Sequence, residues 1–127
     1  ETKSLAHKYC YRHQCYETTR QVAEYLELRE GSYSSSFQSR LAGQPWLKPY
    51  TDKVVENFAE TGTKKMAIVT PAFVSDCLET LEEIAMEAKE DFIEKGGEEF
   101  HVVPCLNDDK EWVKTLSRWI DEWANLN

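Results

Sequence analysis

One stretch of the chain constrains the fold more than any other: a short apolar strand pattern followed at once by a long amphipathic helix pattern. Residues 64–69, Lys-Lys-Met-Ala-Ile-Val, have the length and apolar content of a strand that is covered on both faces in a parallel sheet. The helix pattern begins near Asp76 and ends at the pair Gly96-Gly97. Because strands that lead into helices are the repeating unit of α/β folds, we expect a parallel sheet flanked by helices.

Apolar residues on this expected helix recur three and four residues apart, which is the spacing of one face of an α-helix. They are Leu78, Leu81, Ala85, Ala88 and Phe92, and we expect the helix to pack against another part of the protein through this face. Asp76 and Glu79 have the spacing of the N-cap and N3 residues of a capping box, in which each side chain accepts a backbone N–H. That spacing gives Glu79 a structural role as one option.

Carboxylates form a second row on the same helix. Glu79, Glu83 and Glu87 follow one another four residues apart, roughly opposite the apolar face at about 100° per residue, and Asp76, Glu90 and Glu94 join them. Like charges four residues apart cost about 0.2–0.5 kcal/mol per pair, so a domain of ordinary stability tolerates a solvated acidic face. Hard cations favour arrays of carboxylate oxygens, so the row also fits a path for a metal ion.

Three further helices are expected from apolar spacing and helix-breaking residues. They run from about residue 15 to 28, from Thr51 to near Gly62, and from a cap at Asn107 or Asp108 toward the C-terminus. The last helix carries an apolar stripe of Trp112, Leu116, Trp119, Ile120 and Trp123. Such stripes usually face the interior, so we expect this one to form part of the core.

Two more strands and one long loop complete the expected fold. Tyr33 and Phe37 alternate with serines, which is a weak strand signal, and residues 99–105 give a third strand. Residues 41–49 contain one glycine and two prolines and are expected to be a loop, in which Trp46 forms a stiff wall or packs over the neighbouring helix.

Side chains that can do chemistry follow each of the three expected strands. Arg40 follows the first, Glu79 the second and Asn107 the third. Strands that alternate with helices pair in parallel through crossovers, and their ligands bind outside the carboxyl ends of the strands. We therefore expect these three residues to converge on one edge of the sheet.

Composition excludes several classes of protein. The chain has 127 residues, 41% of them hydrophobic, and a net charge of -8, which is enough chain for one α/β domain and argues against a nucleic-acid surface. No apolar run approaches the length that spans a bilayer. The four cysteines, at positions 10, 15, 77 and 105, lack the paired spacing of a structural zinc site. We expect a cytoplasmic protein with reduced thiols, with peripheral contact to a membrane left open.

Four blocks of sequence closely resemble the C-terminal half of bacterial ferrochelatases and occur in that family's order. They are Gln38-Ser39-Arg40, the segment from Pro45 to Asp52, the segment from Phe73 to Glu83, and the segment from Pro104 to Asn107. Ferrochelatases insert ferrous iron into a porphyrin, the metallation step of haem biosynthesis. The resemblance implies a chelatase-like fold of two similar parallel α/β halves, with the porphyrin in the cleft between them. Residues 1–127 look like most of the second, Rossmann-like half.

The resemblance also implies roles for individual acids. Glu79 matches the family's active-site glutamate, which faces the porphyrin centre opposite an essential histidine and is implicated in metal binding or in proton transfer from the pyrroles. Glu83 and Glu87 match the next acidic steps, thought to lead the metal toward that centre. Asp76 matches a neighbouring acidic position, and Cys77 stands where some members carry a histidine.

Two further residues are implied on the substrate side. Trp46 matches an aromatic residue of the pocket wall. Arg40 can offer its charge to a porphyrin propionate or pair with an acid of the fold. Ferrous iron is expected as a substrate. No iron–sulfur cluster is expected, because the additional cysteines with which some ferrochelatases hold one near the C-terminus have no counterpart here.

One motif of the family has no match. The Ser-x-His-Gly-Ile/Leu-Pro motif that supplies the essential histidine would lie just upstream of Lys8, and none of His7, His13 or His101 stands in such a motif. We therefore expect a fragment of a longer chain that lacks the N-terminal half and one central strand. Such a fragment should be inactive alone and should self-associate through unpaired strand edges.

Two classes of function remain from the sequence. The first is a ferrochelatase, a lyase to which this chain contributes the acidic half of the active site. The alternative is a non-catalytic tetrapyrrole- or metal-binding α/β module that never had the histidine. The sequence encoded before Glu1 distinguishes them, because the first reading requires the histidine motif and a second α/β half upstream.

Overall fold

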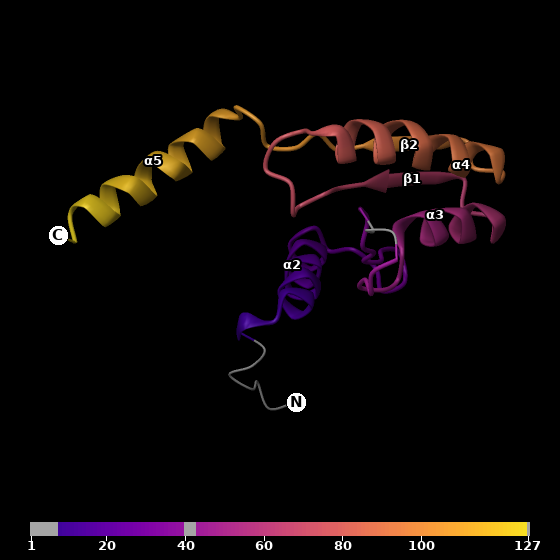
Figure 1. The fold of residues 1–127 in the computed structure, drawn as a ribbon, viewed down its shortest axis with the longest axis horizontal. Coiled ribbons are helices and arrows are strands. Elements are labelled where there is room, and N and C mark those ends of the chain that lie inside the picture. Colours follow the sequence, from indigo (N-terminus) through magenta and orange to yellow (C-terminus); the bar gives the residue numbers. More distant parts are fainter. Residues whose placement is uncertain (1–7, 40–42, 127) are drawn as a thin grey trace.

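The computed structural model describes residues 8–39 and 43–126, and its centre is a strand, helix, strand unit (Figure 1). Along the described chain the elements are α2 (Tyr11–Tyr25), α3 (Thr51–Glu60), β1 (Lys65–Ile68), the π-helix η1 (Glu79–Ala88), α4 (Lys89–Glu94), β2 (Glu99–Val102) and α5 (Lys110–Ala124). Ala88 and Lys89 both have helical backbone angles, so η1 and α4 form one continuous helix.

The sheet is parallel, as the sequence predicts. β1 and β2 pair directly, with Met66 opposite Phe100 and Ile68 opposite Val102. In the described residues the sheet has these two strands alone, so each strand has one edge without a neighbouring strand. This small, open parallel sheet fits the predicted α/β class.

Only one face of this small sheet is covered. Burial alternates along both strands: Met66 and Phe100 are half-buried, whereas Ala67 and His101 on the other face are exposed. The expectation that residues 64–69 are covered on both faces is therefore wrong for the described chain, because its helices pack on a single side of the strands. Parallel sheets normally occur with both faces covered.

The core lies between the covered face, α3 and the continuous helix. It consists of Val55, Ala59, Ala88 and Phe92, with Met66 and Phe100 packed against it. The rings of Phe92 and Phe100 are 5.5 Å apart, centre to centre. α3 and α4 lie side by side, and both contribute to this core.

The buried side of the continuous helix differs from the predicted apolar face. The buried residues are Thr80, Ile84, Ala88 and Phe92, each four residues from the next. Leu78 and Leu81, which α-helical spacing places on the buried face, are 73% and 53% exposed. The cause is the π winding: a turn closed by i→i+5 hydrogen bonds holds more residues than an α turn, so residues four apart stay on one side.

Two expectations for the N-terminal region need correction. The first helix begins at Tyr11 rather than near residue 15 and ends at Tyr25 rather than 28. The segment from Tyr33 to Phe37 forms no strand; Phe37 makes a single parallel bridge to Tyr50, with Phe37 N–H donating to Pro49 O at 2.9 Å. Serine-rich alternation was too weak a signal, because the partner of this segment is a loop rather than a strand.

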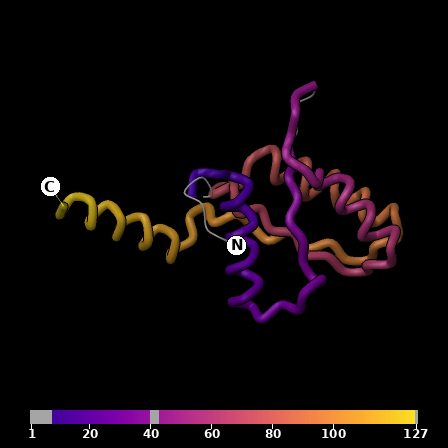
Figure 2. The backbone as a smooth tube through the Cα atoms, turned by 90° about the horizontal axis from the view of Figure 1, so that it is seen from below, coloured from indigo at the N-terminus to yellow at the C-terminus, as the bar shows by residue number. Residues whose placement is uncertain are grey.

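The last helix is not part of the core of this chain. α5 has no buried residue, and Trp119, Ile120 and Trp123 are 52%, 64% and 68% exposed. Both views show α5 projecting away from the other elements (Figure 1, Figure 2). The predicted stripe is therefore present but uncovered. The helix is capped by Asp109, whose carboxylate accepts from Glu111 N–H and Trp112 N–H, rather than by Asn107 or Asp108.

The predicted helix stop at Gly96-Gly97 is confirmed, and each glycine has a physical reason. Gly96 has a φ of 104°, in the left-handed region that glycine enters without strain. Gly97 is buried, and a Cβ there would collide with the ring of Phe92. The turn therefore brings the backbone directly against the largest core side chain.

Replacing Gly97 with alanine should lower the free energy of unfolding by about 1–3 kcal/mol, because the added methyl group overpacks the Phe92 site. Urea denaturation followed by tryptophan fluorescence measures the change. In a double variant, Phe92→Leu should relieve part of the clash, so the two effects should be less than additive. Additive losses would show that the methyl group does not meet Phe92.

Candidate functional site

The acidic row runs along the π-wound part of the helix. Glu79, Glu83 and Glu87 each precede a buried residue, so they flank the buried row of Thr80, Ile84 and Ala88. The sequence pattern places them opposite the buried face, and they flank it instead because the buried residues differ from the predicted apolar face. Glu79 and Glu83 are half-buried, and Glu87 is exposed. Four residues are close to one full turn of either an α-helix or a π-helix, so the three carboxylates follow one another along one side.

A loop segment lies directly beside the first two glutamates. Gln38 donates from Nε2 to the carbonyl of Glu79 at 3.0 Å, and Ser39 Oγ donates to Glu83 Oε2 at 3.4 Å. Trp46 donates from its indole Nε1 to the carbonyl of Gln38 at 2.9 Å. The predicted aromatic wall is thus joined to the acidic row through Gln38. Arg40 lies outside the described residues.

The loops that follow β1 and β2 meet through Asp76 and Asn107. Asn107 Nδ2 donates to Asp76 Oδ2 at 2.7 Å, and Asn107 Oδ1 accepts from the Asp76 backbone N–H at 2.9 Å. The expectation that Asn107 lies at the carboxyl edge of the sheet beside the acidic helix start is borne out by these bonds.

The predicted capping box does not form. Asp76 accepts from the side chains of Asn107 and Thr80 instead of from a helical N–H. The hydroxyl of Thr80, a residue only 1% exposed, accepts from Cys77 N–H at 3.0 Å. The N–H that Glu79 would accept from in a capping box is that of Asp76, and it donates to Asn107 Oδ1 at 2.9 Å instead.

Two carboxyl groups at this edge have lowered pKa values. Hydrogen bonding from the Cys77 side chain, with a smaller contribution from the backbone, lowers the pKa of Glu79 below its ordinary value. Hydrogen bonds from Asn107 and then from Cys105 lower the pKa of Asp76. Burial raises the pKa of the Cys105 thiol. The carboxyl groups of Glu79 and Asp76 therefore carry a negative charge at neutral pH.

The described residues contain no group of three or more His, Cys, Asp or Glu side chains arranged to hold a metal ion. The glutamates of the acidic row are spaced along the helix axis, so they offer successive single positions rather than one closed ligand shell. Carboxylates in this arrangement can attract a hard cation and leave most of its hydration in place.

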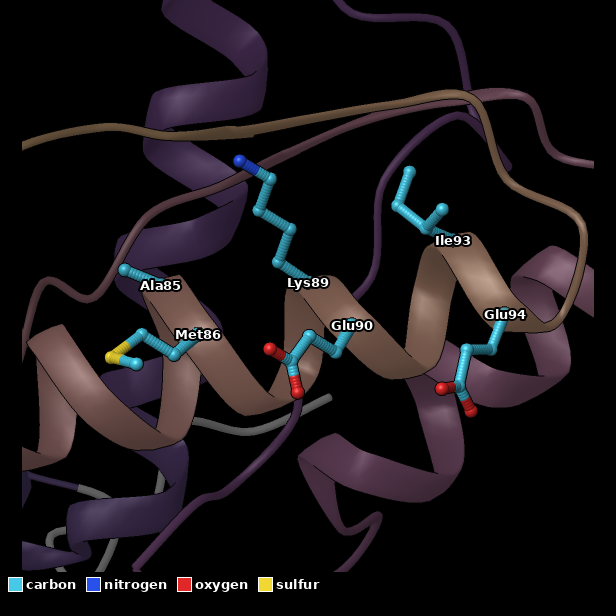
Figure 3. Close-up of a pocket in the computed structure, with 6 residues that line it drawn as sticks. All are labelled: Ala85, Met86, Lys89, Glu90, Ile93 and Glu94. Atoms are coloured by element: carbon cyan, nitrogen blue, oxygen red, sulfur yellow. The ribbon is translucent and has the colours of Figure 1, made fainter.

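A hollow of about 370 Å³ lies farther along the same helix, lined by Ala85, Met86, Lys89, Glu90, Ile93 and Glu94 (Figure 3). Two acids expected to extend the row, Glu90 and Glu94, stand here. None of Trp46, Asp76, Glu79, Glu83 or Glu87 lines it. Its position away from the strand ends separates it from the candidate site.

Sequence reasoning missed the residues that hold the site together. Gln38 and Ser39 belonged to a recognised block but had no assigned role, and Thr80 was not considered. Thr80 could have been found from its spacing: it lies four residues before Ile84 and eight before Ala88, on what proves to be the buried side of the helix.

Comparison with known proteins identifies the family. The Ferrochelatase family model matches residues 2–124. The chain is 48% identical over 126 residues to the ferrochelatase of Opitutus terrae, with 99% of this chain and 36% of the relative covered. It is 51% identical over 110 residues to the ferrochelatase of Pseudomonas fluorescens, with 87% and 32% covered.

The ferrochelatase of Legionella pneumophila is 46% identical over 113 residues, with 89% of this chain and 34% of the relative covered. The chain thus spans about a third of the length of these curated relatives. With nearly its whole length matched and close to half of the aligned residues identical, the chain belongs to the ferrochelatase family.

Proposed function

We propose that this chain supplies the acidic side of the active site of a ferrochelatase, a lyase that inserts ferrous iron into a porphyrin during haem biosynthesis. The observation that carries the proposal is the row of Glu79, Glu83 and Glu87 on the π-wound helix, with Trp46 tied to its first turn through Gln38, in a member of that family. Iron and porphyrin are both substrates in this proposal.

Glu79 is the proposed catalytic carboxylate. Metallation replaces two pyrrole N–H protons by a dication, which requires a negative charge and a proton acceptor beside the ring. The lowered pKa of Glu79 keeps it ionised at neutral pH, which favours attraction of the cation. Glu83 and Glu87 are the proposed earlier positions of the metal, in order of increasing exposure to solvent.

Trp46, Arg40 and Asp76 are the proposed residues of the porphyrin side. Trp46 is 39% exposed and its indole N–H is already satisfied, so its ring is available to a flat macrocycle. Arg40 would offer a positive charge to a propionate. Asp76 lies at the carboxyl edge of the sheet, beside the start of η1.

The uncovered surfaces are the proposed contacts with the remainder of the parent protein. They are the open face of the sheet, its unpaired strand edges and the apolar stripe of α5. Burial of apolar area stabilises such contacts by about 25 cal/mol per Å². In the isolated chain the same surfaces are exposed to solvent, and we propose that they cause self-association.

In the described part of the chain, no helix has both the length and the apolar content needed to span a bilayer. We propose a cytoplasmic location, with any membrane contact being peripheral.

The acidic row should bind Fe²⁺ or a divalent substitute such as Co²⁺ weakly, through carboxylate oxygens. Isothermal titration of this chain should give low affinity, and the double variant Glu83→Gln, Glu87→Gln should bind more weakly still. Binding should also be lost as the pH falls through the lowered pKa of Glu79, because a protonated carboxyl group does not hold metal. Identical isotherms for the two proteins would reject the row as a metal path.

The isolated chain should not metallate porphyrin, whereas the full-length parent should. In the parent, Glu79→Ala should lower the rate about 100-fold or more, the range for loss of a proton-transfer group. Glu94→Ala is the matched control, since Glu94 is an acid of the same helix that lines the separate hollow. Absorbance of the metalloporphyrin gives the rates, and equal losses for the two variants would refute the assignment of Glu79.

The isolated chain should sediment as associated species whose size grows with concentration. Ile120→Glu should shift it toward monomer, because the charge falls within the uncovered stripe of α5. Ser117→Glu adds the same charge outside the stripe and should change little. A monomer at every concentration would contradict self-association, and equal effects of the two variants would exclude the stripe as its cause.

A further inference from the structure

Asn107 joins the two loops at the carboxyl edge of the sheet through an unusually complete set of hydrogen bonds. Its amide Nδ2 donates to Asp76 Oδ2 at 2.7 Å and to the Cys105 carbonyl at 3.2 Å. Its Oδ1 accepts from Asp76 N–H at 2.9 Å. Its backbone N–H donates to the Val74 carbonyl at 2.9 Å. Asn107, in the loop that follows β2, therefore binds the segment that follows β1 through three of its atoms: Nδ2, Oδ1 and the backbone N.

The backbone of Asn107 supports this role. Its φ of 47° lies in the left-handed region, which asparagine visits more readily than most residues. A non-glycine residue keeps this conformation when its surroundings hold it there. Here the side-chain bonds to Asp76 and the backbone bond to Val74 do so.

The set of bonds continues into the first turn of η1. Asp76 uses Oδ2 for Asn107 and Oδ1 for Thr80 Oγ1, 3.1 Å away. Thr80 is almost fully buried and its hydroxyl accepts from Cys77 N–H. The Cys77 carbonyl in turn accepts from Thr80 N–H and Leu81 N–H, at 3.1 and 2.9 Å. Glu79 lies within this bonded turn.

We propose that Asn107 is a positioning residue for the acidic row: by pairing with Asp76 it fixes the first turn of η1, and with it Glu79, relative to the carboxyl end of the sheet. In this proposal Asn107 acts through Asp76 and not by contact with metal or porphyrin. The consequence for catalysis rests on the proposed function of Glu79, whereas the effect on the helix start does not.

Exchange of the Thr80 and Leu81 amide protons tests the structural part directly in this chain. In Asn107→Asp the acceptor for Asp76 N–H is kept, the donor is lost and a second carboxylate faces Asp76. Exchange at both amides should become about tenfold faster, the effect expected for loss of one hydrogen bond. The control is the amide of Val54 in α3, which donates to the carbonyl of Tyr50. Its exchange rate should change far less.

The reciprocal variant, Asp76→Asn with Asn107→Asp, restores one donor facing one acceptor at the same net charge. Its exchange at Thr80 and Leu81 should return to within about threefold of the original chain. Rescue by the swap supports pairing as the cause. Unchanged exchange in Asn107→Asp, or no rescue by the swap, would overturn the proposal. Both variants keep a polar side chain of the same size at each position, so they test the pairing without removing either side chain.

Metallation by the full-length parent separates this inference from the proposed function. Asn107→Asp should lower the rate constant of the parent. The swap is followed by amide exchange alone, because Asp76 is itself a proposed residue of the porphyrin side. A parent in which Glu79→Ala keeps full activity would refute the proposed function of the row, while the exchange rates would still decide the positioning role. Normal activity in Asn107→Asp despite faster exchange would overturn the link from Asn107 to Glu79.

Discussion

The four-residue spacing between buried side chains in η1 is the constraint on which the rest of the structure depends. Thr80, Ile84 and Ala88 bury one side of a π-wound helix, and Phe92 continues the series into α4. Each of the three buried residues of η1 is preceded by a glutamate, at 79, 83 and 87, so the spacing that packs the core also sets the spacing of the carboxylates. π segments are uncommon and are frequent at functional sites. Here the packing of the core and the geometry of the candidate site are one feature.

That winding needs a fixed starting point, which the loops at the carboxyl edge of the sheet supply. Asp76 is bound on one side by Asn107 and on the other by Thr80, so the helix start is tied to both strands. On its other flank the Glu79 carbonyl accepts from Gln38. Two segments distant in sequence therefore hold one turn. Polar groups bonded in this way specify a geometry as well as stabilising it.

The elements defined by local chemistry could be predicted from the sequence. The strand at 65–68, the helix from Thr51 and the stop at Gly96 follow from apolar content, spacing and glycine. The π winding could not be predicted in this way. Leu81 and Ala85 fit the buried face of an α-helix as well as Ile84 and Ala88 fit the buried face of a π-helix, and tertiary packing decides between the two faces. The Asn107 to Asp76 pairing joins residues 31 positions apart, and only their shared sheet edge was predictable.

The stripe of α5 was predicted as core and stands uncovered, and the reason is physical rather than a fault of the pattern. A spacing pattern indicates that a face will be buried, but it does not say by what. Trp112 and Trp119 pack edge to face, 5.9 Å apart between ring centres, yet the rest of the face meets solvent. The open face of the parallel sheet is a second surface of this kind, because parallel sheets normally have both faces covered. In the described residues no element covers either surface, and the chain spans about a third of its relatives' length. Both uncovered surfaces therefore have the composition of buried faces, which is the basis for proposing them as contacts with the remainder of a longer protein.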